Sequence, residues 1–190
     1  MKTSQDPRHL KRQKIVQDIF ALSANPKTKI VEQKSREIIQ KLNEIDEIIR
    51  QSAPEWTIEK INQIDLAILR LAVFELCLEL TEPSKVIIDE AIELAKEFGL
   101  ENSPAFVNGA LGKALLNKTR ILKIIANKLG AEEEKLVPAA NLLTDLNATD
   151  LEIADLLAVL EKDLNISAPS NLRQFQTVGN IIEFIEEHND

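Results

Sequence analysis

Residues 66–80 form the longest apolar run of the chain, and this run limits the fold more than any other feature. Arg70, Glu75 and Glu79 are its only charged residues. A helix that is apolar nearly all round its axis is stable only when other elements surround it. We therefore expect a helix over 65–80 at the centre of a bundle. The run is too short and too charged to cross a bilayer, which takes about 20 apolar residues.

Helical periodicity covers most of the remaining chain, and we expect an all-α fold. Five glycines, seven prolines and 4% aromatic residues in 190 positions favour helices over sheets. Alternation typical of strands is absent from the sequence. Apolar spacing and the breaks between segments predict further helices at 8–22, 29–51, just after 57, 84–98, 104–116, 121–129, 150–164 and after 177. The pattern resets around 117–119, where we expect one domain to end and another to begin.

The net charge of −8 is unevenly distributed between these two parts. Residues 1–118 carry 17 Lys and Arg against 18 Asp and Glu, whereas residues 119–190 carry 6 against 13. Asp6 is the only acidic residue among the first fourteen. These also hold five basic side chains, the basic tip, which are Lys2, Arg8, Lys11, Arg12 and Lys14. The tip could attract phosphate and the acidic second domain would repel it.

The sequence lacks the cysteines and histidines that a disulfide, a catalytic triad or a metal site would need. Cys77 is the only cysteine, so an intramolecular disulfide is impossible, and its apolar surroundings predict a buried core residue. His9 and His188 lie near opposite ends of the chain, are expected to be exposed, and form no visible triad or metal site. Residues 1–14 lack the apolar stretch of a secretory signal. We expect a cytoplasmic protein that is not an enzyme and has no metal and no cofactor.

Three segments resemble the NusB family of bacterial transcription antitermination factors. They are 64–76 (IDLAILRLAVFEL), 88–99 (IDEAIELAKEFG) and 103–109 (SPAFVNG). Residues 12–20 (RQKIVQDIF) look like the family's basic first helix, with fewer arginines than usual. The resemblance spans about 8–117 and implies two small helical bundles, so we predict a NusB-like RNA-binding domain over 1–118. It also implies binding of single-stranded boxA-like RNA together with the ribosomal protein NusE.

Residues 119–190 resemble acyl carrier proteins, which implies a four-helix domain. Residues 121–130 (ILKIIANKLG) look like the first helix of that family. Residues 145–152 (DLNATDLE) fall where the family carries Asp-Leu-Gly-Ala-Asp-Ser-Leu-Asp. In that family phosphopantetheine is attached to the serine, and Asp150 stands at the matching position. A carboxylate cannot accept the group, so we predict a carrier fold that lacks its modification site. Its acidic second helix could dock on a basic protein partner.

The basic tip is the first candidate RNA contact. Lys11, Arg12 and Lys14 are expected in the first turns of a helix, where cations oppose the helix dipole. Phosphate would compensate, since each neutralised phosphate releases counterions. The alternative is an ordinary solvated segment, which the charge pattern alone slightly favours.

Phe106 is the second candidate. It lies at the rim of the core face of its helix, and Lys113 follows seven residues later on the same stripe. With Asn102 and Ser103 at the helix N-terminus, it could stack on an unpaired base and hold backbone phosphate. The alternative is a half-buried packing residue. In NusB relatives the matching turn contacts RNA, and the resemblance carries Asn102, Ser103 and Phe106 across as RNA-binding residues.

Other residues have expected roles as well. Asp65 matches an acidic position that faces NusE in relatives, while a plain helix N-cap is an equal alternative. Trp56 is expected to pack between helices. Gly99 is expected to end a helix as a C′ glycine, and Gly109 and Gly112 to permit close helix packing.

We therefore predict an antitermination factor that binds boxA-like RNA and NusE in support of ribosomal RNA transcription. Its acidic second domain would limit non-specific RNA binding or recruit another protein. Two alternatives remain open, which are a carrier protein with an accessory helical part and a protein–protein scaffold with no RNA role.

Overall fold

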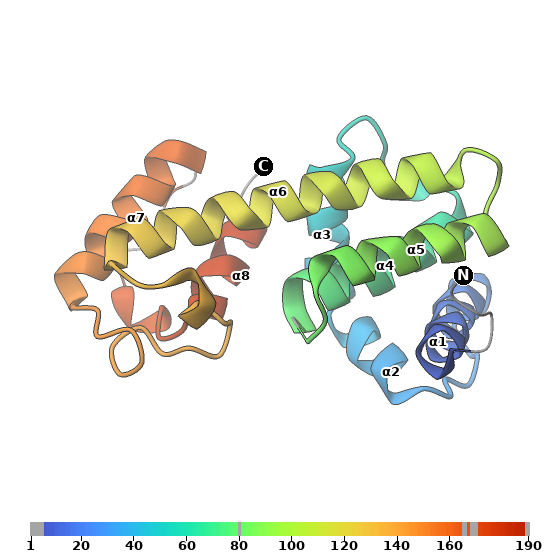
Figure 1. The fold of residues 1–190 in the computed structure, drawn as a ribbon, viewed down its shortest axis with the longest axis horizontal. Coiled ribbons are helices and arrows are strands. Elements are labelled where there is room, and N and C mark those ends of the chain that lie inside the picture. The colour runs from blue at the N-terminus through green and yellow to red at the C-terminus, as the bar shows by residue number, and fades with distance from the viewer. Residues whose placement is uncertain (1–5, 80, 165–166, 168–170, 189–190) are drawn as a thin grey trace. The chain divides into compact units, whose positions relative to one another are not determined.

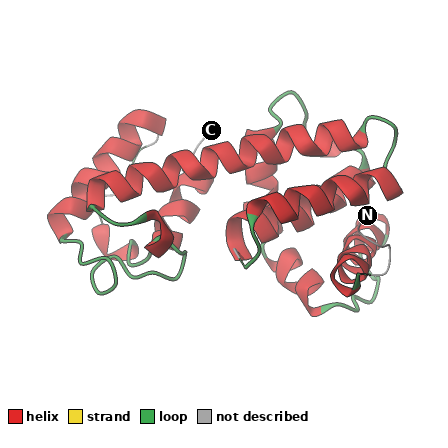
Figure 2. Cartoon of the chain, in the orientation of Figure 1, coloured by secondary structure: helices red, strands yellow, loops and turns green. Residues whose placement is uncertain are grey.

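The computed structural model describes residues 6–79, 81–164, 167 and 171–188 (Figure 1). The chain divides into two compact units, Met1–Leu115 and Leu116–Asp190. Within the described residues every regular element is helical, apart from one isolated antiparallel bridge between Asn141 and Thr177 (Figure 2). The prediction of an all-α fold is confirmed for this part of the chain.

The helices of the first unit differ from expectation mainly at one break. The elements are α1 (Pro7–Ala24), α2 (Gln33–Gln40), α3 (Leu42–Ser52), the 3₁₀ turn η1 (Ile58–Lys60), α4 (Gln63–Val73), the π-helical segment η2 (Phe74–Glu79), α5 (Ser84–Phe98) and the start of α6 (Ser103–Leu129). The single helix expected over 29–51 is two helices, because the backbone at Lys41 leaves the helical region (φ −108°, ψ 17°).

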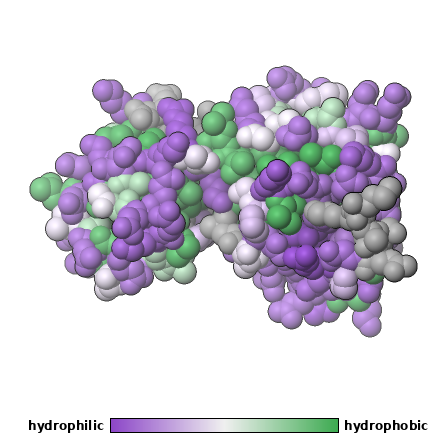
Figure 3. Space-filling view, viewed as in Figure 1, coloured by the Kyte–Doolittle hydropathy of each residue, from purple (hydrophilic) through white to green (hydrophobic). Residues whose placement is uncertain are grey.

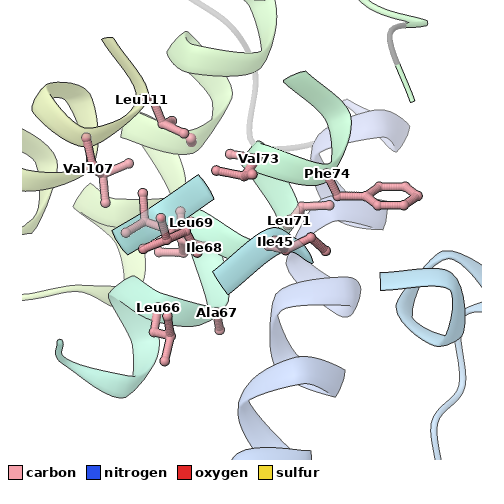
Figure 4. Packing of buried hydrophobic residues seen from close by; sticks show 14 of the residues in the cluster. Ile45, Leu66, Ala67, Ile68, Leu69, Leu71, Val73, Phe74, Val107 and Leu111 are labelled. Carbon is pink, nitrogen blue, oxygen red and sulfur yellow. The ribbon is translucent and has the colours of Figure 1, made fainter. Parts of the chain in front are cut away.

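Helix α4 is the centre of the first unit, as its all-round apolar sequence predicts. It packs against α1, α3 and α5. Its side chains interlock with those of the neighbouring helices, as the close-up of Ile68, Leu69, Val107 and Leu111 shows (Figure 4). These four side chains are fully buried. Fully burying one such side chain stabilises a fold by roughly 1.5–3 kcal/mol.

Both ends of α4 differ from the sequence prediction. The Asn62 side chain caps the helix by accepting a hydrogen bond from the Ile64 N–H (2.9 Å), so α4 begins at Gln63. Asp65 therefore lies inside the first turn, and its interpretation as an N-cap is wrong. At the other end the helix widens into the π-helical η2, in which Cys77 is buried as expected.

The turn between α5 and α6 depends on Gly99. The backbone of Gly99 is extended (φ −88°, ψ −172°) rather than left-handed, so the expected C′ geometry is not adopted. A Cβ atom at this position would lie 2.5 Å from the Ser103 Cβ and 2.6 Å from the Ala95 carbonyl oxygen. Gly99 is needed here because the start of α6 approaches its backbone so closely.

We expect Gly99→Ala to destabilise the first unit by about 1–3 kcal/mol, since the added methyl group overlaps Ser103 and Ala95. Gly109→Ala is the matched control. A Cβ at Gly109 meets no atom within 4 Å, which also corrects the expected close packing there and at Gly112. Removing a helical glycine at Gly109 should stabilise by up to about 1 kcal/mol. Urea unfolding of both variants measures this, and equal effects would contradict the clash.

Helix α6 is continuous from Ser103 to Leu129, whereas the sequence predicts a reset at 117–119. The apolar pattern does shift there, but residues 117–119 contain neither proline nor glycine to interrupt the backbone. The division between the two units falls inside this helix, close to the predicted boundary at 118/119.

The second unit contains the end of α6, the 3₁₀ turn η3 (Glu133–Lys135), α7 (Asp150–Leu164), the 3₁₀ turn η4 (Leu172–Gln174) and α8 (Val178–His188). Its core includes Ile125, Leu156 and Ile181, all fully buried. The predicted capping box is confirmed at α7. The Thr149 hydroxyl accepts a hydrogen bond from the Glu152 N–H (3.3 Å), and the Glu152 carboxylate accepts one from the Thr149 N–H (2.8 Å).

The visible surface of each unit is mainly hydrophilic (Figure 3). Among the described residues, no helix combines the length and the apolar character that crossing a membrane requires.

Candidate nucleic-acid interface

Three separate segments of the first unit enclose a groove of about 370 Å³. They are the chain around η1, the first turn of α4, and the turn from α5 into α6. We call it the aromatic groove, and its lining residues are Trp56, Lys60, Ile61, Asn62, Asp65, Leu100, Glu101, Asn102, Ser103 and Phe106. The structure thus brings Asp65 together with Asn102, Ser103 and Phe106. Its volume falls in the range of small-molecule sites.

Two aromatic rings form one wall of the groove. Trp56 and Phe106 meet edge to face, with ring centroids 5.9 Å apart and an interplanar angle of 69°. Phe106 is half-buried, while Trp56 is 47% exposed, so the expectation that Trp56 packs between helices is wrong. Sequence reasoning missed Trp56, Lys60 and Leu100 as groove residues. The position of Trp56 just after Pro54, outside any periodic apolar run, was the available signal.

Asp65 and Ser103 are the buried polar residues of the groove. Asp65 is 6% exposed and Ser103 is 2% exposed. The Ser103 hydroxyl oxygen accepts a hydrogen bond from the Leu100 N–H (2.8 Å), and the same hydroxyl donates to the Asp65 carboxylate. Within the described residues, the Oδ1 atom of Asp65 has no hydrogen-bond partner. Burial raises the pKa of Asp65, and the hydrogen bond from Ser103 only partly offsets this.

Arg12 is in the interior of the first unit, so its expected contact with RNA is not supported. It is 6% exposed, and its Nε donates a hydrogen bond to Glu75 Oε2 (2.9 Å). Lys34 joins this cluster, with Nζ 3.2 Å from Glu75 and 2.7 Å from Glu79. The Arg12 guanidinium thus forms an ion pair that links α1 to η2. Its partner lies 63 positions away in the sequence, so no local pattern could reveal the pair.

The other described cations of the basic tip are exposed. Arg8, Lys11 and Lys14 reach solvent on α1, and Arg8 also lies 3.6 Å from Asp6. Lys2 lies outside the described residues. Lys113 is exposed on α6, two turns beyond Phe106. Among the residues described as lining the groove, none of these cations appears.

Hydrogen bonds nevertheless link helix α1 to the end of α5. The turn that follows α5 lines the groove. Gln13 donates hydrogen bonds to both oxygens of the Glu97 carboxylate (2.8 and 2.7 Å). At 100° per residue, Lys14 lies about 100° round α1 from Gln13, and Lys11 about 160°. Lys14 is therefore closer than Lys11 to the side of α1 that meets α5.

His9 makes a second link between α1 and α5. Its side chain is 14% exposed and lies between two carboxylates, with Nδ1 2.9 Å from Glu90 and Nε2 3.2 Å from Glu97. The expectation of an exposed His9 is wrong, because both partners are more than 80 positions away in the sequence. The side chain of His188 lies outside the described residues. Burial lowers the pKa of His9, but the two carboxylates together outweigh it and raise the pKa above 6.5.

This arrangement predicts a pH-dependent stability. A protonated His9 stabilises the fold fully below the unfolded pKa of about 6.5, and that stabilisation is lost as the pH rises through the raised folded pKa. The difference in melting temperature between the wild type and His9→Gln should therefore be largest in mild acid and shrink in mild alkali. Gln13→Ala removes a link that does not titrate, so its effect should be the same across the series. A pH-independent His9→Gln effect would contradict the paired imidazolium.

Asp150 is the residue that the sequence predicts at the position of the carrier family's modified serine. It is exposed at the first position of α7, directly after Thr149. Asn147, where that family has glycine, has φ 54°, a left-handed conformation that asparagine tolerates better than most residues.

Comparison with known proteins identifies the first unit. The family model described as NusB family matches residues 2–115, which is more than half of the chain. The chain belongs to the NusB family. The predicted family is thereby confirmed.

Curated relatives of this NusB-family chain carry the name transcription antitermination protein NusB. That of Streptomyces avermitilis is 49% identical over 74 residues, which are 39% of this chain and 51% of the relative. That of Chloroflexus aggregans is 43% identical over 91 residues, 47% of this chain and 57% of the relative. The chain thus spans little more than half the length of these two relatives.

A solved structure, T. maritima NusB, matches with a TM-score of 0.52 and 31% identity. The match covers 61% of this chain and 93% of that one. Residues 119–185 match a second family model, described as phosphopantetheine attachment site. The predicted acyl-carrier-like part that follows the NusB-family unit is thereby confirmed as well.

Proposed function

We propose that the NusB-family unit binds single-stranded, boxA-like RNA together with the ribosomal protein NusE, as a non-catalytic antitermination factor in the cytoplasm. The observation that carries this proposal is the aromatic groove. Four residues expected to contact RNA or the partner converge there from α4, the turn before α6 and the first turn of α6. They are Asp65, Asn102, Ser103 and Phe106. An accessible aromatic ring beside buried hydrogen-bonding groups suits an unpaired base, which presents both a flat face and polar edges.

The exposed cations would contribute to the affinity for RNA through its phosphates, without distinguishing one RNA sequence from another. We assign phosphate contacts to Arg8, Lys11, Lys14 and Lys113, each of which is exposed. Contacts of this kind make affinity fall steeply with salt. Arg12 is left out of this set because it is buried against Glu75.

Asp65 is the residue proposed to meet NusE, by resemblance to the family. Its side chain is 6% exposed and lines the groove. Any group that contacts the carboxylate therefore has to enter the groove. We do not expect Asp65 to act as part of a flat protein–protein contact.

A salt series on the complex with NusE tests the RNA proposal. Fluorescence anisotropy would measure binding of boxA-like RNA to the wild type, to Lys11→Gln/Lys14→Gln, and to the charge-matched control Lys123→Gln/Lys128→Gln, whose lysines are exposed in the second unit. The first double variant should bind RNA more weakly. Its affinity should also fall less steeply with salt concentration, by the amount expected for the loss of about two phosphate contacts. The control should match the wild type. Equal behaviour of both, or binding of NusE with no RNA, would favour a scaffold role.

The carrier-like match supports a second candidate, in which the second unit holds phosphopantetheine. We propose instead that it acts without the group, because Asp150 replaces the serine that would accept it. A role in limiting non-specific RNA binding or in docking a basic protein suits its surplus of acidic residues.

Intact mass spectrometry decides between these two roles. After incubation with coenzyme A and a phosphopantetheinyl transferase, the mass of the wild type should stay unchanged. Asp150→Ser restores the hydroxyl and is the matched variant, and an ordinary acyl carrier protein serves as the positive control. Added mass on the wild type would contradict the proposed loss of carrier activity.

A further inference from the structure

Among the described residues, the two most exposed large apolar side chains lie among charges of opposite sign. Val31 is 71% exposed and lies among basic residues, and Leu151 is 72% exposed and lies among carboxylates. One exposed apolar side chain is ordinary on a protein surface. An apolar side chain surrounded by charges of one sign has the composition of a small interface, in which the apolar group is covered and the charges select the partner.

Val31 belongs to the irregular segment that joins α1 to α2 (Figure 1). Exposed and partly buried positions alternate along this segment, as in an extended chain, so Lys27, Lys29 and Val31 lie on its outer side. Arg36 of α2 is also exposed, and its Nη2 donates a hydrogen bond to the Ile30 carbonyl oxygen (3.2 Å). That bond places the guanidinium beside Val31. We call Lys27, Lys29, Val31 and Arg36 the basic strip.

Hydrogen bonds order the segment that carries the basic strip. The Asp18 carboxylate, which is 9% exposed, accepts hydrogen bonds from the N–H groups of Val31 (3.1 Å) and Glu32 (2.9 Å). Glu32 lies on the inner side of the segment, while Glu37 is exposed in α2 and offsets one of the three positive charges. The strip stays net positive, and an ordered surface loses less entropy on binding than a mobile one.

Leu151 has the opposite surroundings at the start of α7. At 100° per residue, Asp150 and Glu152 lie on either side of Leu151, and Asp155 follows one turn later. All three carboxylates are exposed. We call Leu151 and these three residues the acidic patch. Lys162 lies three turns further along α7, outside the patch.

We propose that the acidic patch of one molecule docks on the basic strip of a second copy of this chain. Leu151 then covers Val31, and the three carboxylates face the two lysines and Arg36. A second copy is favoured over another partner because the same chain carries both surfaces, each with one apolar side chain and three charges. An RNA phosphate would also neutralise the strip, but it would leave Val31 exposed. The inference gives the acidic second unit a partner and is independent of RNA binding by the first unit.

Charge reversal tests this pairing directly, because two weakened variants should restore each other. The strip variant carries Lys27→Glu and Lys29→Glu, and the patch variant carries Asp150→Lys and Asp155→Lys, all at exposed positions. Sedimentation velocity of the full chain, over a series of protein concentrations and without RNA, measures self-association. Melting curves check that each variant is folded.

The wild type should associate in about 0.1 M salt and dissociate in about 1 M salt, because the Debye length falls from about 10 Å to about 3 Å. Either variant alone should associate at least about tenfold more weakly, since its two surfaces now carry like charges. The equimolar mixture should associate like the wild type, because opposite charges face each other again. Leu151→Gln leaves every charge in place and should also weaken association. The control Lys123→Glu/Lys128→Glu reverses two exposed charges outside both surfaces and should match the wild type.

A wild type that stays monomeric at every concentration would overturn the proposal. A mixture of folded strip and patch variants that associates no better than either variant alone would also overturn it. So would association that survives both reversals, or a control that weakens association as much as the strip variant does. Each of these results leaves the RNA proposal standing, since the salt series on the complex with NusE tests that proposal separately.

Discussion

Glu75→Ala should lower the free energy of unfolding of the first unit by about 3–5 kcal/mol, because it leaves the buried guanidinium of Arg12 without its partner. Glu75 is 3% exposed and Arg12 is 6% exposed, so water cannot replace the lost carboxylate. Lys34, 3.2 Å from the same carboxylate, would also lose a contact. The substitution removes the ion pairs that link α1 and α2 to η2.

Urea unfolding at neutral pH measures this effect. Glu93→Ala is the control, since Glu93 pairs with Lys96 at 2.7 Å but both side chains are more than half exposed. Its loss should change the stability by less than about 1 kcal/mol. A Glu75→Ala variant as stable as the control would show that the Arg12 ion pair does not hold α1 in place.

Phe106→Ala should weaken RNA binding by about 1–3 kcal/mol, the usual contribution of one aromatic ring that stacks on a base. That corresponds to a loss of roughly tenfold per 1.4 kcal/mol. Because Phe106 also packs against the core and against Trp56, the alanine variant should lose some stability too. Phe106→Leu keeps much of the packing and lacks the aromatic face, so it should bind RNA as weakly while it unfolds near the wild type.

Phe20→Ala is the matched control for this prediction. Phe20 is 41% exposed on α1, outside the residues that line the groove. Its truncation should leave RNA affinity unchanged in the same anisotropy titration. If Phe20→Ala and Phe106→Ala weaken binding equally, or if Phe106→Leu binds like the wild type, the aromatic groove does not stack a base.

The parts of the fold that sequence could predict are those decided by local patterns. All-round apolar character placed α4 in the centre, and Thr149 followed by Glu152 predicted the cap of α7. The start of α6 is recognisable because residues 103–109 are consecutive. These features depend on neighbours within a few positions, which a sequence displays directly.

The parts that sequence could not predict depend on pairs distant along the chain. The charge pattern predicts Arg12 as a surface cation, because a helical repeat reveals neither its pairing with Glu75 nor its burial. The sequence predicts an exposed His9 for the same reason, since Glu90 and Glu97 are distant in the chain. The neighbourhood of Trp56 and Phe106 joins segments 50 positions apart. Basic residues near a chain end therefore predict a charged surface only after their burial is known.

The central claim is that unpaired RNA lies in the aromatic groove and along the exposed cations of α1. Photo-crosslinking of 4-thiouridine-substituted boxA-like RNA to the full chain in complex with NusE, with the attachment sites mapped by mass spectrometry, tests this most directly. We expect crosslinks at Trp56 and Phe106 and in the turn between α5 and α6, with further ones near Lys11 and Lys14. Crosslinks confined to the second unit or to α2 and α3, with the groove unlabelled, would contradict the account.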